Sequence, residues 1–330
     1  MRAPIISIII PFYGVEKYIG RCVNSIKSQR FSDYECILID DESLDNSYEI
    51  VKNMIENDSR FKIIKQKNKG VGGARNTGLL YASGRYICFL DSDDWWDESF
   101  LDLMMDKMVS TNCDVVVCAY QEVTEGLEKT KIPNNLEDKI EDNLKATIAV
   151  LESPTLWNKL YKRSLWNGIK FPENIKHGED LATLYKVMFK AERVYYFNDC
   201  LYNYFIRKDS LTRTYSEIKV KDRLFAFEMI KNDILENYKK INKSFIYKLY
   251  YQHTILPTYF DIISSTETIL NKTKELKIFK LKLDRKYFNL KSIIDQDSLK
   301  LLYKIMLIDL LFGYNFLLTI QKLKRNYEIK

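Results

Sequence analysis

The sequence predicts an α/β protein that continues into an all-helical C-terminal region. Continuous aliphatic runs such as Ile5–Ile10 and Cys36–Ile39 alternate with segments of helical periodicity. Uninterrupted apolar runs are typical of strands that are buried on both faces of a parallel sheet. From about Ser216 onward strand signals disappear, and Lys, Ile, Leu and Tyr recur at helical spacing. We therefore expect a parallel sheet flanked by helices, followed by helices alone.

The predicted elements follow one another with short connections. Strands are expected at 5–10, 36–39, 61–64, 86–90 and 114–119, and helices at 15–29, 47–57, 74–82 and 100–109. Asp45 or Asn46 can cap the second helix, and Gly70–Gly73 should form a flexible bend. Residues 121–153 should form a surface loop and helix, whereas 155–161 and 195–206 look strand-like. In such sheets ligands gather beyond the carboxyl ends of the strands, so the residues there should share one rim.

Composition and charge exclude some classes of function. The 330 residues suffice for one large or two ordinary domains. The chain has a net charge of +6. Residues 271–291 carry eight Lys or Arg against two acidic residues, and this surplus alone equals the net charge of the whole chain. The remainder is no polycation, so nucleic-acid binding is not expected. The six cysteines include no C-x-x-C pair, and no signal peptide precedes the first strand, which favours free thiols in the cytoplasm.

Residues 299–323 are mostly apolar, but Lys304, Asp309, Gly313 and Asn315 interrupt them. The uninterrupted runs are far shorter than the roughly 20 residues of a membrane-spanning helix. One interpretation is a helix packed on the core. The other is a peripheral helix at a membrane surface, assisted by the basic stretch before it.

Three carboxylates, Asp91, Asp93 and Asp94, follow the predicted strand at 86–90. Like charges this close repel one another unless a cation lies among them. Oxygen ligands suit Mg²⁺ or Mn²⁺, and such an ion could bridge a diphosphate. The alternative is an acidic turn, because carboxylates are common in turns.

Two other strand ends carry residues suited to binding a base. Asp41 could accept a hydrogen bond from a base N–H such as uracil N3–H, and Tyr13 offers an aromatic face for stacking. The alternative is that Asp40 and Asp41 form a turn or cap the next helix.

The segment Asn68–Gly78 is rich in glycine, which permits close approach of the backbone to a phosphate. A helix beginning at Ala74 would direct free N–H groups at an anion, and Arg75 would add a cationic fork. The spacing matches neither a Walker loop nor the Rossmann fingerprint, so a plain glycine-rich turn is the alternative.

Glu179 and Asp180 precede an apolar helical pattern. One of the two carboxylates could act as a general base toward a hydroxyl group. Adjacent acids cannot both point the same way, so at most one should do this. The alternative is simple compensation of the helix dipole.

Taken together, these motifs resemble the bacterial family 2 glycosyltransferases, inverting enzymes of the GT-A fold that act on capsules, exopolysaccharides and other cell-surface glycans. The resemblance covers residues 4 to about 212 in the family's order and spacing. The matching segments are IIIPFY at 8–13, IDDES at 39–43 with Asp45, NKGVGGARNTG at 68–78, FLDSDDW at 89–95, WNKLY at 157–161 and GED at 178–180. Each motif alone is weak evidence, whereas the set is highly specific.

The resemblance implies a UDP-sugar donor, a Mn²⁺ or Mg²⁺ ion at a DXD motif, and a glycan or lipid-linked oligosaccharide acceptor. It implies that Asp180 is the catalytic base, assisted by Glu179, and that Asp93, with Asp91, binds the metal. The residues implied to bind the nucleotide sugar are Pro11, Tyr13, Asp41, Arg75, Asp91 and Ser92. Those implied near the acceptor or the diphosphate are Trp157, Lys159 and Arg207.

Two positions depart from the family pattern: Gly14 replaces the usual Asn, and Phe205 replaces the first basic residue of a Y-Y-R-x-R stretch. The Q-x-x-R-W motif of processive synthases is absent, so transfer of a single sugar is expected. We expect a GT-A domain at 1–215, with a nucleotide-binding half (1–120) and an acceptor and catalytic-base half (121–215), and a helical domain at 216–330. The alternatives are a non-catalytic nucleotide-sugar-binding protein and a nucleotidyltransferase.

Overall fold

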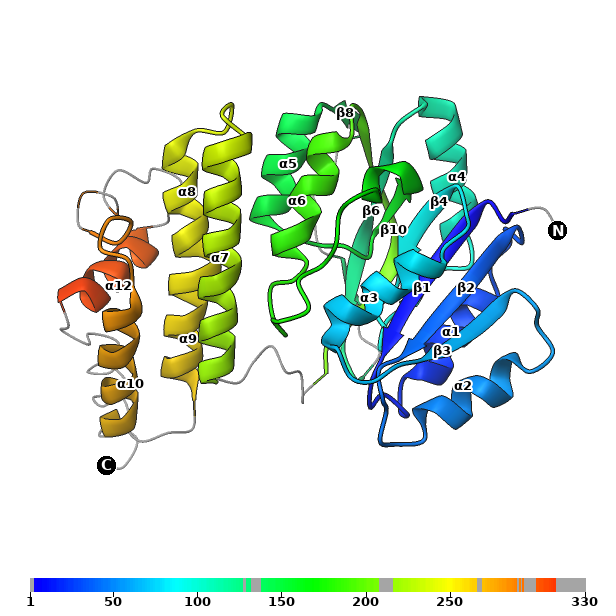
Figure 1. Cartoon of the computed structure of the whole chain (residues 1–330), viewed down its shortest axis with the longest axis horizontal. Coiled ribbons are helices and arrows are strands. Elements are labelled where there is room, and N and C mark those ends of the chain that lie inside the picture. Colours follow the sequence, from blue (N-terminus) through cyan, green and yellow to red (C-terminus); the bar gives the residue numbers. More distant parts are fainter. Residues whose placement is uncertain are drawn as a thin grey trace. The chain divides into compact units, whose positions relative to one another are not determined.

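The computed structural model describes residues 3–126, 129–131, 138–207, 216–265, 269–289, 291, 293 and 301–312. The chain forms two compact units, Met1–Lys208 and Asp209–Lys330 (Figure 1). The sequence predicted a domain boundary after residue 215, whereas the two units divide after Lys208. Residues 208–215 lie outside the described residues.

The described part of the first unit contains one ten-stranded sheet with the strand order β3-β2-β1-β4-β9-β6-β10-β5, while β7 pairs with β6 and β8 with β10. The strands are β1 Ile6–Phe12, β2 Tyr34–Asp40, β3 Phe61–Lys65, β4 Tyr86–Phe89, β5 Trp95–Trp96, β6 Val115–Val123, β7 Lys129–Lys131, β8 Lys139–Glu141, β9 Lys159–Lys162 and β10 Val194–Phe205. The five strands predicted in the first 120 residues are all present. The short β5 was not predicted.

The sheet is parallel only in part. Strands β1 to β4 are parallel to one another, as predicted. Strand β9, however, runs antiparallel to both of its neighbours, β4 and β6. Apolar runs reveal that a strand is buried but carry no information about its direction, so the sheet is mixed.

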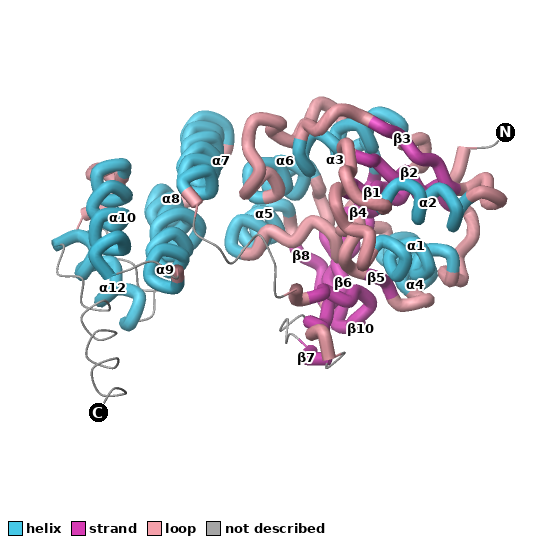
Figure 2. The backbone as a smooth tube through the Cα atoms, turned by 90° about the horizontal axis from the view of Figure 1, so that it is seen from below, coloured by secondary structure: helices cyan, strands magenta, loops and turns pink. Residues whose placement is uncertain are grey.

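Helices cover both faces of the sheet. On one face α1 (Ile19–Lys27), α2 (Ser47–Ile55) and α4 (Phe100–Thr111) share an apolar core with Ile8, Leu38 and Cys88. Figure 2 shows α1 and α4 together on this side. Helix α1 begins at Ile19 rather than Val15, because residues 15–18 form a turn in which the Tyr18 N–H donates to the Val15 carbonyl.

The expected bend at Gly70–Gly73 was wrong, because α3 begins at Gly70 and continues to Tyr81. Its glycines permit close packing. A Cβ atom on Gly78 would lie 2.3 Å from Ile9 Cγ2 and 3.1 Å from Ile39 Cδ1, so α3 lies directly against β1 and β2 on the second face of the sheet.

The middle of the chain is more ordered than expected. Strand β6 continues to Val123, and α5 (Asn143–Glu152) buries Val150 and Leu151 rather than lying wholly on the surface. A 3₁₀ turn at Arg163–Trp166 and helix α6 (Leu181–Lys190) follow, and α6 directly succeeds the Glu179–Asp180 pair.

The described residues of the second unit that have regular structure are all helical, as predicted. They form α7 Glu217–Asn237, α8 Lys243–Leu249, a π-helical segment Tyr250–Ile255, α9 Leu256–Ser264, α10 Ile269–Lys282 and α12 Leu301–Phe312. Aromatic rings occupy the core, and Phe227 stacks on Tyr250 at 4.3 Å. No described helix combines the length and apolarity required to cross a bilayer. Of the segment 299–323, the structure describes only 301–312.

Candidate active site

The carboxyl ends of β1, β2 and β4 lie side by side, because β1 pairs in parallel with both of the others. Tyr13, Asp41 and Asp91 therefore follow neighbouring strand ends on one rim. Tyr13 is 49% exposed, so its ring is accessible to a ligand, whereas Pro11 is buried within β1.

The Asp41 side chain is held in place by two hydrogen bonds to one oxygen. Asp41 Oδ1 accepts from Gln66 Nε2 at 2.7 Å and from the Lys69 backbone N–H at 2.9 Å. No hydrogen bond to Asp41 Oδ2 is found among the described residues. The fixed carboxylate thus retains one oxygen that could accept from a base.

Each member of the aspartate cluster has a different partner. Asp91 Oδ1 lies 3.0 Å from Arg75 Nη2, and Asp93 Oδ2 lies 2.9 Å from Arg207 Nε. Asp94 accepts from the Tyr202 hydroxyl at 2.6 Å and from the Phe205 backbone N–H at 2.7 Å. Arginine side chains therefore compensate the charges of Asp91 and Asp93, whereas Asp94 has two neutral donors.

Asp94 is only 1% exposed. Burial, followed by the nearby Asp93 and Asp91, raises the pKa of Asp94 well above its usual range. Its two partners both belong to β10, so Asp94 fastens the loop after β4 to that strand. Trp157 stacks on the Tyr202 ring at 4.1 Å and extends this packing.

Two arginines hold Asp93: Arg207 contacts its side chain and Arg21 contacts its backbone carbonyl. Burial raises the pKa of its carboxyl group, and the Arg207 charge opposes that shift. Arg21 donates from Nη2 to the Asp93 carbonyl at 2.9 Å, and its guanidinium lies 3.7 Å from the Trp95 ring centroid and 4.2 Å from that of Phe205. Arg21 was not singled out from the sequence, where it is merely one polar residue of α1.

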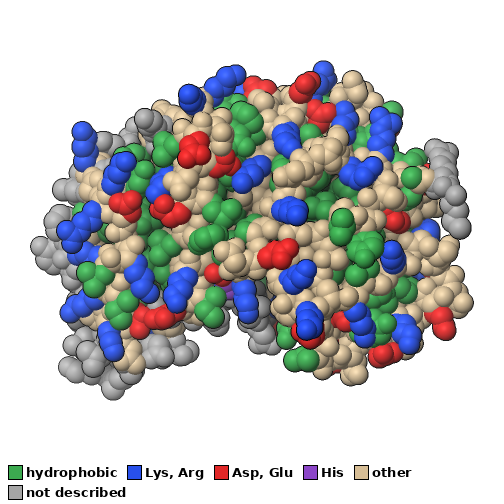
Figure 3. All heavy atoms as spheres, viewed as in Figure 1, with side chains coloured by type: hydrophobic (Ala, Val, Ile, Leu, Met, Phe, Trp, Pro, Cys, Tyr) green, Lys and Arg blue, Asp and Glu red, His purple; other side chains and the backbone are tan. Residues whose placement is uncertain are grey.

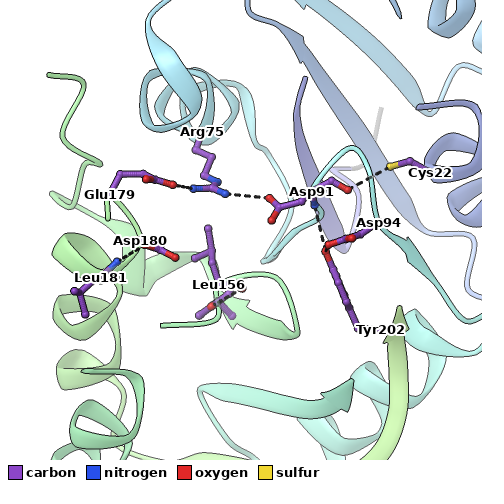
Figure 4. A network of polar contacts seen from close by, with 10 residues as sticks. Cys22, Arg75, Asp91, Asp94, Leu156, Glu179, Asp180, Leu181 and Tyr202 are labelled. Atoms are coloured by element: carbon purple, nitrogen blue, oxygen red, sulfur yellow. Dashed lines mark hydrogen bonds and ion pairs between the residues drawn. The ribbon is translucent and has the colours of Figure 1, made fainter. Parts of the chain in front are cut away.

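Arg75 connects this cluster to the start of α6. Its Nη1 donates to Glu179 Oε1 at 2.7 Å, while Nη2 reaches Asp91 (Figure 4). Burial alone would lower the pKa of Arg75, but the carboxylates of Asp91 and Glu179 raise it above its usual value. The guanidinium is thus charged and neutralised by two acids from distant parts of the chain.

Asp180 follows Glu179 at the N-cap of α6, and its Oδ1 accepts from the Leu181 N–H at 2.7 Å. Glu179 and Asp180 therefore have different partners, as expected for adjacent acids. Burial, and next the Glu179 charge, raise the pKa of Asp180, whereas Arg75 opposes the rise. The residue remains partly exposed. One oxygen caps the helix, and the carboxyl group has the raised proton affinity of a potential base.

Two further residues matched to the family, Lys159 and Ser92, are buried. Lys159 is 2% exposed, and its Nζ donates to Thr155 Oγ1 at 2.8 Å and to Asn158 Oδ1 at 2.7 Å. Burial lowers the pKa of Lys159 to about 7.

The donor set fits a cation that is shared with a phosphorylated ligand. In the part of the chain that the structure describes, no group of three or more His, Cys, Asp or Glu could hold a metal. Mg²⁺, however, is commonly bound by one or two carboxylates together with substrate phosphates. The side chains of Asp91 and Asp93 are 28% and 20% exposed, whereas Asp94 is closed off. Asp91 and Asp93 are therefore the fitting pair.

The mixed sheet with helices on both faces is the arrangement of a GT-A fold. Residues 7–173 match the profile of the family described as "Glycosyl transferase family 2". The chain belongs to this family.

Named relatives agree. GlyA of Streptococcus pneumoniae serotype 4, a glycosyltransferase, is 36% identical over 64% of this chain and 32% of its own length, so the chain spans about a third of that relative. The protein of Bacillus subtilis (strain 168) named "Putative glycosyltransferase EpsH" is 31% identical over 74% of this chain and 75% of its own length.

A solved structure confirms the fold. The structure of S. aureus TarS 1–349 in complex with UDP-GlcNAc has a TM-score of 0.69 at 21% identity, covering 94% of this chain and 88% of that one.

Proposed function

We propose that this chain moves a single sugar from a UDP-sugar to a hydroxyl group of a glycan or lipid-linked oligosaccharide, with inversion at the anomeric carbon. The observation that carries the proposal is the Arg75-centred network, which brings the donor-side Asp91 and the acceptor-side Glu179–Asp180 pair to one buried cation. Binding of UDP and UDP-GlcNAc by TarS, a protein of the same fold, supports the choice of donor.

In this mechanism Asp180 takes the proton of the acceptor hydroxyl, whose oxygen attacks the anomeric carbon opposite the departing UDP. The accessible ring of Tyr13 stacks on the base, and Asp41 accepts from it. Asp91 and Asp93 would hold the divalent metal, Mn²⁺ or Mg²⁺. When bound, that ion neutralises the charge that develops on the leaving diphosphate.

Residues 1–120 then serve the nucleotide, residues 121–215 the acceptor and the base, and residues 216–330 form the helical domain. A nucleotidyltransferase is disfavoured because its phosphate loop should follow the first strand, where this chain has only Gly14. A non-catalytic binding protein is disfavoured because Asp93 and Asp180 are both present.

The test is a UDP-release assay of the full chain against a panel of UDP-sugars with an acceptor mixture of cell-surface glycans, with and without Mn²⁺. We expect metal-dependent release from one donor, since Asp91 and Asp93 supply only two carboxylates and need the diphosphate to complete a site. Formation of UTP and a sugar 1-phosphate when diphosphate is added, instead of UDP, would favour the nucleotidyltransferase, and release from no donor would contradict the proposal.

We also propose that the second unit binds peripherally to an anionic membrane, at the cytoplasmic face of that membrane. A cavity of about 660 Å³ is lined by Lys277, Lys280 and Arg285 together with Leu281 and Phe288. No ion pair involving these three cations is found among the described residues, and Leu281 is 81% exposed. Cations around an apolar floor suit a lipid phosphate and its acyl chain. Sedimentation with phosphatidylglycerol vesicles at low salt should exceed that with phosphatidylcholine, and equal amounts in both pellets would exclude this contact.

A further inference from the structure

Most of the glycine-rich segment Asn68–Gly78 belongs to the packed helix α3, which begins at Gly70. Helix α3 touches the segment that leads into the catalytic pair. A Cβ atom on Gly72 would lie 2.7 Å from the Pro172 carbonyl oxygen and 3.6 Å from Glu179 Cβ. Only a glycine permits this approach without a shift of the backbone.

The side chain of Asn76 fastens the same segment by two hydrogen bonds to the backbone of Phe171. Its Oδ1 accepts from the Phe171 N–H at 2.8 Å, and its Nδ2 donates to the Phe171 carbonyl at 2.9 Å. Gly72 and Asn76 thus dock residues 171–179 on α3, on either side of Arg75 in the sequence.

Arg75 occupies the centre of this contact. The residue is 4% exposed, and its two terminal nitrogens are both engaged, one with Glu179 and the other with Asp91. Its Nε has no partner in the described part of the protein. Figure 4 shows the guanidinium between the two carboxylates, with Asp180 beside Glu179. A side chain so enclosed has little capacity left to touch a nucleotide.

The chemistry of the guanidinium suits it to hold two groups at a fixed separation. Its planar fork is rigid, and hydrogen bonds between ionised partners are short and strong. Glu179 directly precedes Asp180 at the start of α6, so the position of Glu179 limits where the Asp180 carboxylate can lie. Asp91 follows β4 on the donor side of the site.

We infer that Arg75 is a positioning residue that contacts neither donor nor acceptor. By binding Glu179 and Asp91 at the same time, it sets the distance between the Asp180 carboxylate and the donor site. Glu179 is then an anchor for Arg75 rather than a second base. The catalytic part of this inference rests on the proposed function. It differs from the nucleotide contact that the family resemblance implies for Arg75.

The test uses Arg75→Lys and Glu179→Gln in the full chain. Arg60→Gln is the matched control, because Arg60 pairs with Asp58 at 2.6 Å beside the edge strand β3. We expect kcat to fall about 100-fold in both variants, the effect of a small misplacement of a reacting group. The donor KM and the UDP affinity by calorimetry should stay at the wild-type values. The double variant should lose no more than either single variant, because both remove one interaction.

A second readout does not depend on turnover. Hydrogen exchange of the amides in 171–181 should accelerate in both variants and stay unchanged in Arg60→Gln. If UDP affinity falls together with kcat, or if exchange in 171–181 is unaltered, the inference is overturned. If the wild type turns over no UDP-sugar, the proposed function fails, and the exchange rates alone decide whether Arg75 holds the segment. Should Arg75→Lys fail to fold, Glu179→Gln decides, because it removes the charge that pairs with Arg75 and keeps the size of the side chain.

Discussion

At the residue scale, Asp180 combines two properties that a base requires. It is partly exposed, and it lies beside Glu179 in a setting that raises its proton affinity. Glu179, Arg75, Asp91 and Lys159 are the charged groups that interact with it. Their opposing charges leave burial as the main cause of the raised pKa.

The pH dependence of transfer should report this setting. A base acts when deprotonated, so kcat/KM should rise with pH through a pKa well above the value of about 4 of an ordinary aspartate. Glu179→Gln removes a neighbouring negative charge and should move this rise to lower pH. A rate that is already maximal at the ordinary aspartate pKa would contradict the role of burial. The measurement is a pH series of initial rates at constant ionic strength.

The sequence placed Asp91, Asp93 and Asp94 correctly after a buried strand. It could not assign their partners, because Arg75 lies on another element and Arg207 and Tyr202 follow much later in the chain. Asp94 is buried against β10, whereas Asp91 and Asp93 are more exposed. Only the three-dimensional structure reveals this difference.

At the element scale, α3 shows why a glycine pattern is ambiguous. Glycine lowers helix propensity, so the run at 70–73 predicted a bend. Close packing against Ile9, Ile39 and Pro172 overrides that local preference. Nothing within the segment itself reveals such distant neighbours. The direction of β9 was unpredictable for the same reason.

Substitution of Gly78 tests this packing. The Cβ atom of Gly78→Ala would enter the space of Ile9 Cγ2, 2.3 Å away. Overpacking of this kind costs about 1–3 kcal/mol of unfolding free energy, which urea denaturation measures. Gly20→Ala in α1 is the control, because its Cβ meets only Met54 Sδ at 3.8 Å. There alanine should stabilise the helix by about 0.5–1 kcal/mol. Equal effects at the two sites would refute the close contact of α3.

At the scale of the whole molecule, the sequence predicted the fold class well. Strand and helix periodicity predicted the α/β unit and the helical region. The ordered set of motifs predicted the family, which the family profile and the named relatives confirm. The sugar and the acceptor depend on the shape of surfaces that many segments build together. No single motif encodes them.

As the proposed base, Asp180 should be required for transfer, whereas binding of the nucleotide should depend on other residues. Asp180→Asn keeps the side-chain oxygen that accepts from the Leu181 N–H, so α6 should remain capped. The decisive measurement compares wild type and Asp180→Asn in sugar transfer and in UDP calorimetry with Mn²⁺. We predict a loss of transfer of about 100- to 10,000-fold with unchanged UDP affinity. Transfer at the wild-type rate, or loss of UDP binding in step with transfer, would contradict this role of Asp180.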